Sequence, residues 1–253
     1  GIFQRHQVEL LASRGVKTAV VSFGWISWRN ILSSFPYAPE EAFVGLNILR
    51  NFKRPWLPPS LFGEFLKNKL IDGYRKLFKS YCVHHGAPDL IHAHNTLYAG
   101  LAACQIGKEL RIPVVLTEHS SEWMIEENRL TMVKNLREVW REAAAISAVS
   151  SALANRLELL RPPDVSASCL ILGNLLDPFI ERASMDGQNK ISKKDGFILL
   201  SLGGLVPIKN HSLLLRAFAK VFAGHSKVQL RIGGSGPLEG SLREEARLLG
   251  VSG

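Results

Sequence analysis

Two short turns near the end of the chain combine glycine with groups that bind anions. The first has the sequence GGLVPIKN over residues 203–210 and reaches Lys209 where a helix is expected to begin. Free amides and the dipole at a helix start attract anions, and a lysine there adds the charge that holds phosphate. Gly203, Gly204, Lys209 and Asn210 are therefore candidate phosphate-binding residues, the alternative being a tight turn with a solvated lysine.

The second turn has the sequence GGSGP over residues 233–237, between an expected strand and an expected helix. Glycine permits close approach of the backbone to a ligand, so Gly234, Ser235 and Gly236 are candidates for nucleotide contacts. With Gly240 the turn partly matches a dinucleotide-binding fingerprint, but the acidic residue expected about 20 positions later would lie past Gly253. A turn that serves only structure explains these glycines equally well.

Three histidines, His92, His94 and His119, lie at or just after the carboxyl ends of two expected strands. Ligands of open α/β sheets bind at that edge, so we expect His94 and His119 to contact a ligand and His92 to be structural. His92 and His94 share a strand face, but no third ligand has a suitable spacing and no Asp-x-Asp pair occurs. The sequence therefore predicts no metal site. The chain also has no Gly-x-Ser-x-Gly elbow, which argues against a hydrolase triad.

Short apolar runs that alternate with amphipathic stretches must position these groups. Strands are expected at residues 17–23, 90–93, 112–117, 145–149, 169–172, 197–202 and 228–232, and the main helices at 97–110, 126–143, 214–222 and 238–249. This alternation predicts parallel, doubly wound α/β sheets.

The composition changes over residues 181–196, where polar residues dominate and hydrophobic periodicity disappears. We interpret this segment as a linker between a first domain, residues 1–180, and the start of a second, residues 197–253. Two βα units are too few to be stable alone, so we expect the second domain to be incomplete and the chain to be inactive by itself.

The overall composition is that of a soluble globular protein, with 46% hydrophobic and 21% charged residues among 253. No apolar run reaches the roughly 18 residues of a membrane span, and we expect a cytoplasmic protein. The three cysteines are far apart, at positions 82, 104 and 169, which argues against a disulfide framework or a structural zinc site.

Positive charge is concentrated in residues 50–80, which hold eight basic and two acidic residues of a chain with net charge +9. Such clustering favours an anionic partner. An apolar helical stripe, which includes Leu70, Tyr74 and Phe78, accompanies it, and we hypothesise contact with the anionic inner face of a membrane that carries a lipid-linked acceptor. The alternative is a helix that packs on the core with a solvated basic face. No nucleic-acid partner is expected.

Taken in order, the motifs resemble the family 4 retaining glycosyltransferases, which have the α/β GT-B fold of two facing Rossmann-like domains. The matching stretches read PDLIHAH over residues 88–94, IPVVLTEHS over 112–120, AISAVS over 145–150, GNLLD over 173–177 and LRAF over 215–218, together with the two turns. The resemblance covers nearly the whole chain. It also implies that the family's first strand and its glycine loop precede Gly1.

The resemblance implies transfer of a sugar, with retained anomeric configuration, from a nucleotide diphosphate sugar to a glycan or lipid-linked acceptor, as in polysaccharide biosynthesis. It implies neither metal nor cofactor. Lys209 falls on the lysine that holds the donor diphosphate, Gly234 and Gly236 on the turn near the nucleotide, and His119 on the histidine that faces the donor sugar. His94 falls on the acceptor side, and Asn174 and Asp177 fall on an interdomain motif with either a structural or a binding role.

Two departures from the family pattern leave alternatives open. The family has an arginine where this chain has Gly204, and its Glu-x7-Glu motif would lie beyond Gly253. A catalytically silent binder of sugar nucleotides or glycans, and a sugar-nucleotide epimerase of the same fold, therefore stand beside the glycosyltransferase.

Overall fold

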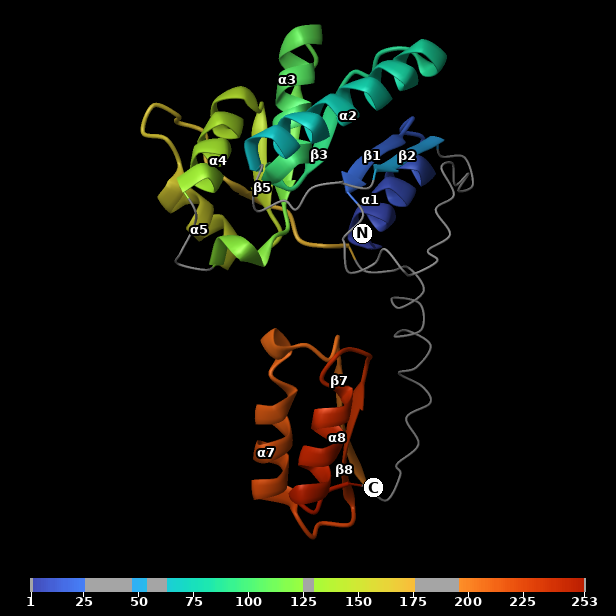
Figure 1. Ribbon diagram of the computed structural model, residues 1–253, viewed down its shortest axis with the longest axis vertical. Helices are drawn as coiled ribbons and strands as arrows, with labels where there is room; N and C mark the ends of the chain where they lie inside the picture. The colour runs from blue at the N-terminus through green and yellow to red at the C-terminus, as the bar shows by residue number, and fades with distance from the viewer. Residues whose placement is uncertain (1, 26–46, 54–62, 125–129, 176–195, 253) are drawn as a thin grey trace. The chain divides into compact units, whose positions relative to one another are not determined.

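The computed structural model describes residues 2–25, 47–53, 63–124, 130–175 and 196–252, which form two compact units, Gly1–Glu181 and Arg182–Gly253 (Figure 1). Each unit is described by itself. Asp177, most of the expected linker, and residues 54–62 of the basic segment lie outside the described residues.

Unit 1 contains two parallel sheets. The first pairs β1 (Ala19–Trp25) with β2 (Asn47–Lys53), and the second has the order β3-β4-β5-β6, formed by Ile91–His94, Val114–Glu118, Ala145–Ala148 and Leu170–Ile171. The helices are α1 (Ile2–Ser13), α2 (Gly63–His85), α3 (Leu101–Leu110), α4 (Leu130–Glu142) and α5 (Ser151–Leu160), with short helical turns η2 (Thr96–Gly100) and η3 (Ser121–Met124). The predicted parallel α/β organisation is confirmed. Strand β2 is not predicted from the sequence, because its basic residues mark it as part of the charged segment.

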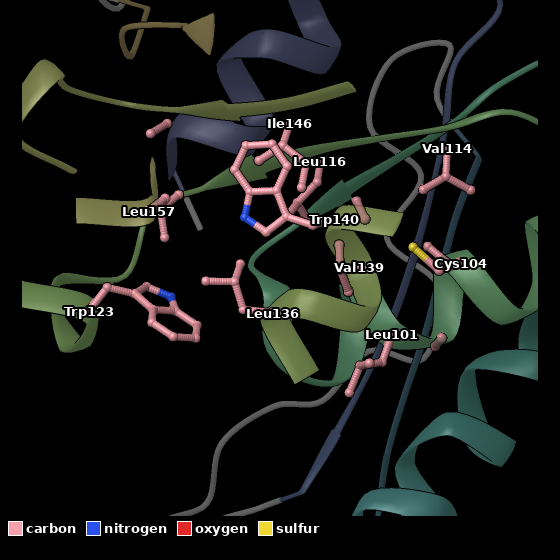
Figure 2. Packing of buried hydrophobic residues seen from close by; sticks show 14 of the residues in the cluster. Leu101, Cys104, Val114, Leu116, Trp123, Leu136, Val139, Trp140, Ile146 and Leu157 are labelled. Carbon is pink, nitrogen blue, oxygen red and sulfur yellow. The ribbon is translucent and has the colours of Figure 1, made fainter. Parts of the chain in front are cut away.

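The core of unit 1 lies between the second sheet and its helices. Leu116 of β4 and Ile146 of β5 pack with Leu136, Val139 and Trp140 of α4, and all five are nearly inaccessible to solvent (Figure 2). Burying one such side chain contributes roughly 1.5–3 kcal/mol. Strand β4 is buried along most of its length, as expected for a parallel strand with both faces covered.

The apolar stripe of α2 packs inward. Leu70, Ile71 and Phe78 are buried, whereas Lys69, Lys76 and Lys79 are exposed. This arrangement matches the alternative interpretation of the basic segment, a core-packed helix with a solvated basic face. No helix among the described residues is long and apolar enough to cross a membrane.

Unit 2 pairs β7 (Phe197–Leu202) with β8 (Val228–Gly233) in parallel, and the helices α7 (His211–Phe222) and α8 (Glu239–Leu248) lie side by side (Figure 1). The helical turn η4 (Pro207–Lys209) precedes α7. Leu205, Leu215 and Leu242 form the centre of a small core. Alternate side chains of β7, among them Leu200 and Leu202, remain exposed.

Candidate active site

The parallel pairing of β3 with β4 brings two of the predicted site residues together. His94 Nδ1 and His119 Nε2 lie 2.9 Å apart, a hydrogen-bond distance, at the carboxyl edge of the sheet. The ring of His92 stacks on that of His94 with a centroid separation of 4.4 Å. The edge therefore carries three adjacent imidazoles, of which His94 and His119 form a hydrogen-bonded pair.

His92 is held in a directed chain of hydrogen bonds that crosses three strands. The Ser147 hydroxyl donates to the Leu116 carbonyl at 3.0 Å and lies 2.8 Å from the Thr117 hydroxyl. Thr117 must therefore donate to Ser147 and accept from His92 Nε2, which is 2.8 Å away. This sequence of donors fixes the Nε2–H form of His92.

The end of β4 is anchored by a fully buried carboxylate that the sequence analysis missed. Glu118 Oε2 accepts hydrogen bonds from the amide and hydroxyl of Thr96, at 2.8 and 2.7 Å. Glu118 Oε1 accepts from the amides of His119 and Ser120, at 3.0 and 2.8 Å. The sequence does contain a signal for this role, because Glu118 ends an apolar strand. An acidic residue that is buried in such a place is almost always held by hydrogen bonds.

Burial disfavours the charged form of all three imidazoles. Burial, with smaller repulsions from His92 and His119, lowers the pKa of His94 to about 3. Burial also lowers the pKa of His92, with His119 adding to the effect. Burial lowers the pKa of His119 as well, although Glu118 and a hydrogen bond with the Asn174 side chain oppose that shift. The structure thus brings Asn174, from the loop after β6, to His119.

The loop after β3 adopts backbone angles that are uncommon for residues with side chains. Asn95 has φ of 70° and accepts a hydrogen bond from the His119 amide through Oδ1 at 3.1 Å. Tyr98 has φ of 62° and ψ of −65°, and 42% of its surface is exposed. Such angles persist where the surroundings enforce them, and they are common beside ligand sites.

In unit 2, backbone hydrogen bonds join the two predicted turns. The Gly203 amide donates to the Gly233 carbonyl at 3.0 Å, and the Leu205 amide donates to the Ser235 carbonyl at 2.9 Å. A Cβ on Gly234 would lie 2.0 Å from the Gly203 carbonyl oxygen, and one on Gly236 would lie 2.5 Å from that of Leu205. These two glycines are therefore required for the close packing of the turns.

Gly204 differs from these glycines. It lies outside the left-handed region, and a Cβ there would meet only Val206 Cγ2 at 3.9 Å and the Ser235 carbonyl oxygen at 4.0 Å. Both are ordinary contact distances. A Cβ therefore fits at position 204 without strain.

The first turn delivers Lys209 to the start of α7. Lys209 is exposed at the end of η4. Asn210 has φ of 49° and precedes α7 without making a side-chain cap hydrogen bond. The helix start therefore presents amides that this side chain leaves open, next to a lysine, which is an arrangement suited to an anion.

Among the described residues, no three His, Cys, Asp or Glu side chains lie close enough together to hold a metal ion. The candidate site in unit 1 consists of the His94–His119 pair and the buried carboxylate of Glu118. Unit 2 supplies the turn with Lys209 at the start of α7, which is suited to an anion.

Comparison with known proteins places these features in context. The sequence description of Glycosyltransferase Family 4 matches residues 4–166. No curated protein matches the chain.

Solved structures share the fold. The Anabaena Alr3699/HepE complex with UDP has 15% identity and a TM-score of 0.53, with coverage of 92% of this chain and 66% of that one. The complex of the same protein with UDP and glucose has 17% identity and a TM-score of 0.51, with coverage of 81% and 53%. A UDP-GlcNAc 2-epimerase from Methanocaldococcus jannaschii has 10% identity and a TM-score of 0.43, with coverage of 92% of this chain and 69% of that one. The chain thus spans about half to two thirds of the Anabaena chain, and its fold is of the α/β GT-B class.

Proposed function

Because the chain belongs to glycosyltransferase family 4, we propose that it transfers a sugar from a nucleotide diphosphate sugar to an acceptor with retention of the anomeric configuration. The observation that carries this proposal is the start of α7, where Lys209 lies beside amides that the Asn210 side chain does not cap. The proposed donor is a substrate, and the proposed reaction uses no cofactor.

The chemistry asks the protein to stabilise charge on a departing diphosphate. The start of a helix carries about half a positive charge, and Lys209 adds a full one. Positive groups that are already in place when the charge develops lower the barrier without reorganisation. This mode of stabilisation needs no metal ion, so we propose a metal-independent transferase.

On the unit 1 side, His119 is proposed to face the donor sugar. A neutral imidazole can exchange hydrogen bonds with a sugar hydroxyl, and burial lowers the pKa of His119 and so favours that form. Its amide is fixed by Asn95 and Glu118. His94, hydrogen-bonded to His119, is proposed to lie on the acceptor side.

The acceptor is proposed to be a glycan or a lipid-linked sugar, presented at the inner face of a membrane. The exposed lysines of α2, Lys69, Lys76 and Lys79, support contact with anionic lipid. Each contributes about 1 kcal/mol near an anionic bilayer. Co-sedimentation with phosphatidylserine vesicles at low and high salt tests this. Binding that is absent at low salt, or indifferent to salt, would refute membrane contact.

A direct experiment separates transfer from the competing functions. Because the chain is expected to be inactive by itself, the intact protein that contains it is incubated with UDP- and GDP-sugars and with glycan acceptors, and the products are analysed by mass spectrometry and NMR. Formation of a glycoside with the donor's anomeric configuration supports the proposal. An epimerised donor indicates an epimerase instead. Nucleotide binding without turnover indicates a silent binder, which the glycine at position 204 favours because it supplies no side-chain contact to a phosphate.

A further inference from the structure

Unit 2 contains a buried imidazole with an unused hydrogen-bonding atom. His211 is the first residue of α7 and only 3% of its surface is exposed. Its Nε2 is buried and has no hydrogen-bond partner among the described residues. A buried polar atom without a partner destabilises the fold, so such an atom calls for an explanation.

Nε2 of His211 faces the side of Gly203 that has no side chain. A Cβ built on Gly203 would lie 3.9 Å from His211 Nε2 and also 3.9 Å from Cγ and Cδ of Lys209. Any residue other than glycine would fill this position. The glycine thus leaves no side chain between the imidazole and the stem of Lys209, and we call this position the Gly203 niche.

The groups around the Gly203 niche share one chemical preference. The imidazole can donate a hydrogen bond, Lys209 carries a positive charge, and α7 begins with amides that the Asn210 side chain does not cap. A negatively charged oxygen satisfies all three, whereas a water molecule would satisfy the imidazole without using the charge.

We propose that His211 is a phosphate-binding residue and that an oxygen of the nucleotide diphosphate enters the Gly203 niche and accepts a hydrogen bond from His211 Nε2. The inference rests on the proposed function and deepens it. It assigns a second hydrogen-bond donor, in addition to Lys209, to a turn whose position 204 supplies no side chain. His211 would contact the diphosphate and not the nucleoside.

The test compares three forms of the full chain, the parent, His211→Phe and His211→Gln, by calorimetric titration with UDP and with uridine. Phenylalanine fills the same space without a polar atom, and the glutamine amide nitrogen can occupy the position of Nε2. We expect His211→Phe to bind UDP about ten-fold more weakly or worse, because a hydrogen bond to a charged group is lost. We expect His211→Gln to restore most of the affinity, and neither change to affect uridine.

A thermal melt without ligand separates this role from a structural one. His211→Phe should melt at the same temperature as the parent or above it, because it removes an unpaired buried nitrogen. Equal UDP affinity in His211→Phe and the parent would overturn the inference and leave the proposed function standing. Parallel losses of UDP and uridine binding, without rescue by His211→Gln, would also overturn it. A parent chain that binds neither UDP nor GDP would refute the proposed function itself.

Discussion

Replacement of Glu118 by glutamine should strongly destabilise unit 1. The two side chains have nearly the same shape, but an amide has one accepting oxygen where the carboxylate has two. Glu118 accepts four hydrogen bonds, two on each oxygen, and the amide nitrogen of Glu118→Gln would replace one of these oxygens. The Thr96 hydroxyl can turn to accept, and the His119 amide keeps Asn95 Oδ1, so either orientation of the amide leaves one backbone N–H, that of Thr96 or Ser120, without an acceptor. An unpaired buried donor costs about 1–3 kcal/mol, which is a sizeable part of the roughly 5–15 kcal/mol by which domains are typically stable.

Urea unfolding, monitored by tryptophan fluorescence, measures this loss of stability in unit 1. The five tryptophans, at positions 25, 28, 56, 123 and 140, all precede residue 182, so their emission reports on unit 1 alone. With a urea dependence of about 1–3 kcal/mol per molar, the expected loss lowers the midpoint by an amount on the order of 1 M.

Glu109→Gln provides the matched control. Glu109 Oε1 lies 2.9 Å from Arg75 Nη2, but half of the Glu109 side chain is exposed. Pairs of this kind contribute less than about 1 kcal/mol, so its midpoint should scarcely move. If Glu118→Gln unfolds at the same urea concentration as Glu109→Gln, the four hydrogen bonds do not anchor the end of β4 and the reasoning fails.

Other changes test the two sites. Gly234→Ala should lower the melting temperature of unit 2 sharply, because its Cβ would lie 2.0 Å from the Gly203 carbonyl oxygen, whereas Gly204→Ala, with no contact closer than 3.9 Å, should leave it unchanged. Gly204→Arg should keep the fold and bind UDP more tightly in calorimetric titration, since a guanidinium can bond phosphate twice; an unchanged affinity would argue against a phosphate at this turn. Lys209→Ala should weaken UDP binding about 10- to 150-fold, from the loss of about 1.5–3 kcal/mol, and unchanged binding would contradict the assignment. The pKa of His94 falls to about 3 on folding from an ordinary 6.5, so the unfolded chain takes up this proton first and the stability of unit 1 should fall as the pH drops from 6.5 towards 3. His94→Gln should flatten that part of the pH dependence in urea titrations, and an equally steep dependence in the variant would exclude His94 as its source.

The sequence predicted the order of strands and helices well, because apolar runs and amphipathic stretches alternate clearly along most of the chain. It missed β2, where basic residues obscure the pattern. It pointed to His94 and His119, because the ends of parallel strands meet at one edge. It could not show that the two rings are hydrogen-bonded, because the distance between them depends on the register of β3 with β4.

Other features depend on tertiary packing and leave little trace in the sequence. The four partners of Glu118 come from two separate segments, and no local pattern joins them. Likewise, Gly204 and Gly234 look alike in the sequence, and only the positions of their neighbours distinguish a glycine that packing requires from one that it does not.

The hydrogen bonds between the two turns in unit 2 limit how this protein can change in evolution. The Leu205 amide bonds the Ser235 carbonyl, and the Leu238 amide bonds the Leu205 carbonyl at 3.1 Å, so neither turn can lengthen without breaking the other. Insertions and deletions should therefore be rare in both turns among relatives. New donor preferences would have to arise by exchange of side chains at positions that the backbone leaves open, such as Gly204 and the exposed Ser235.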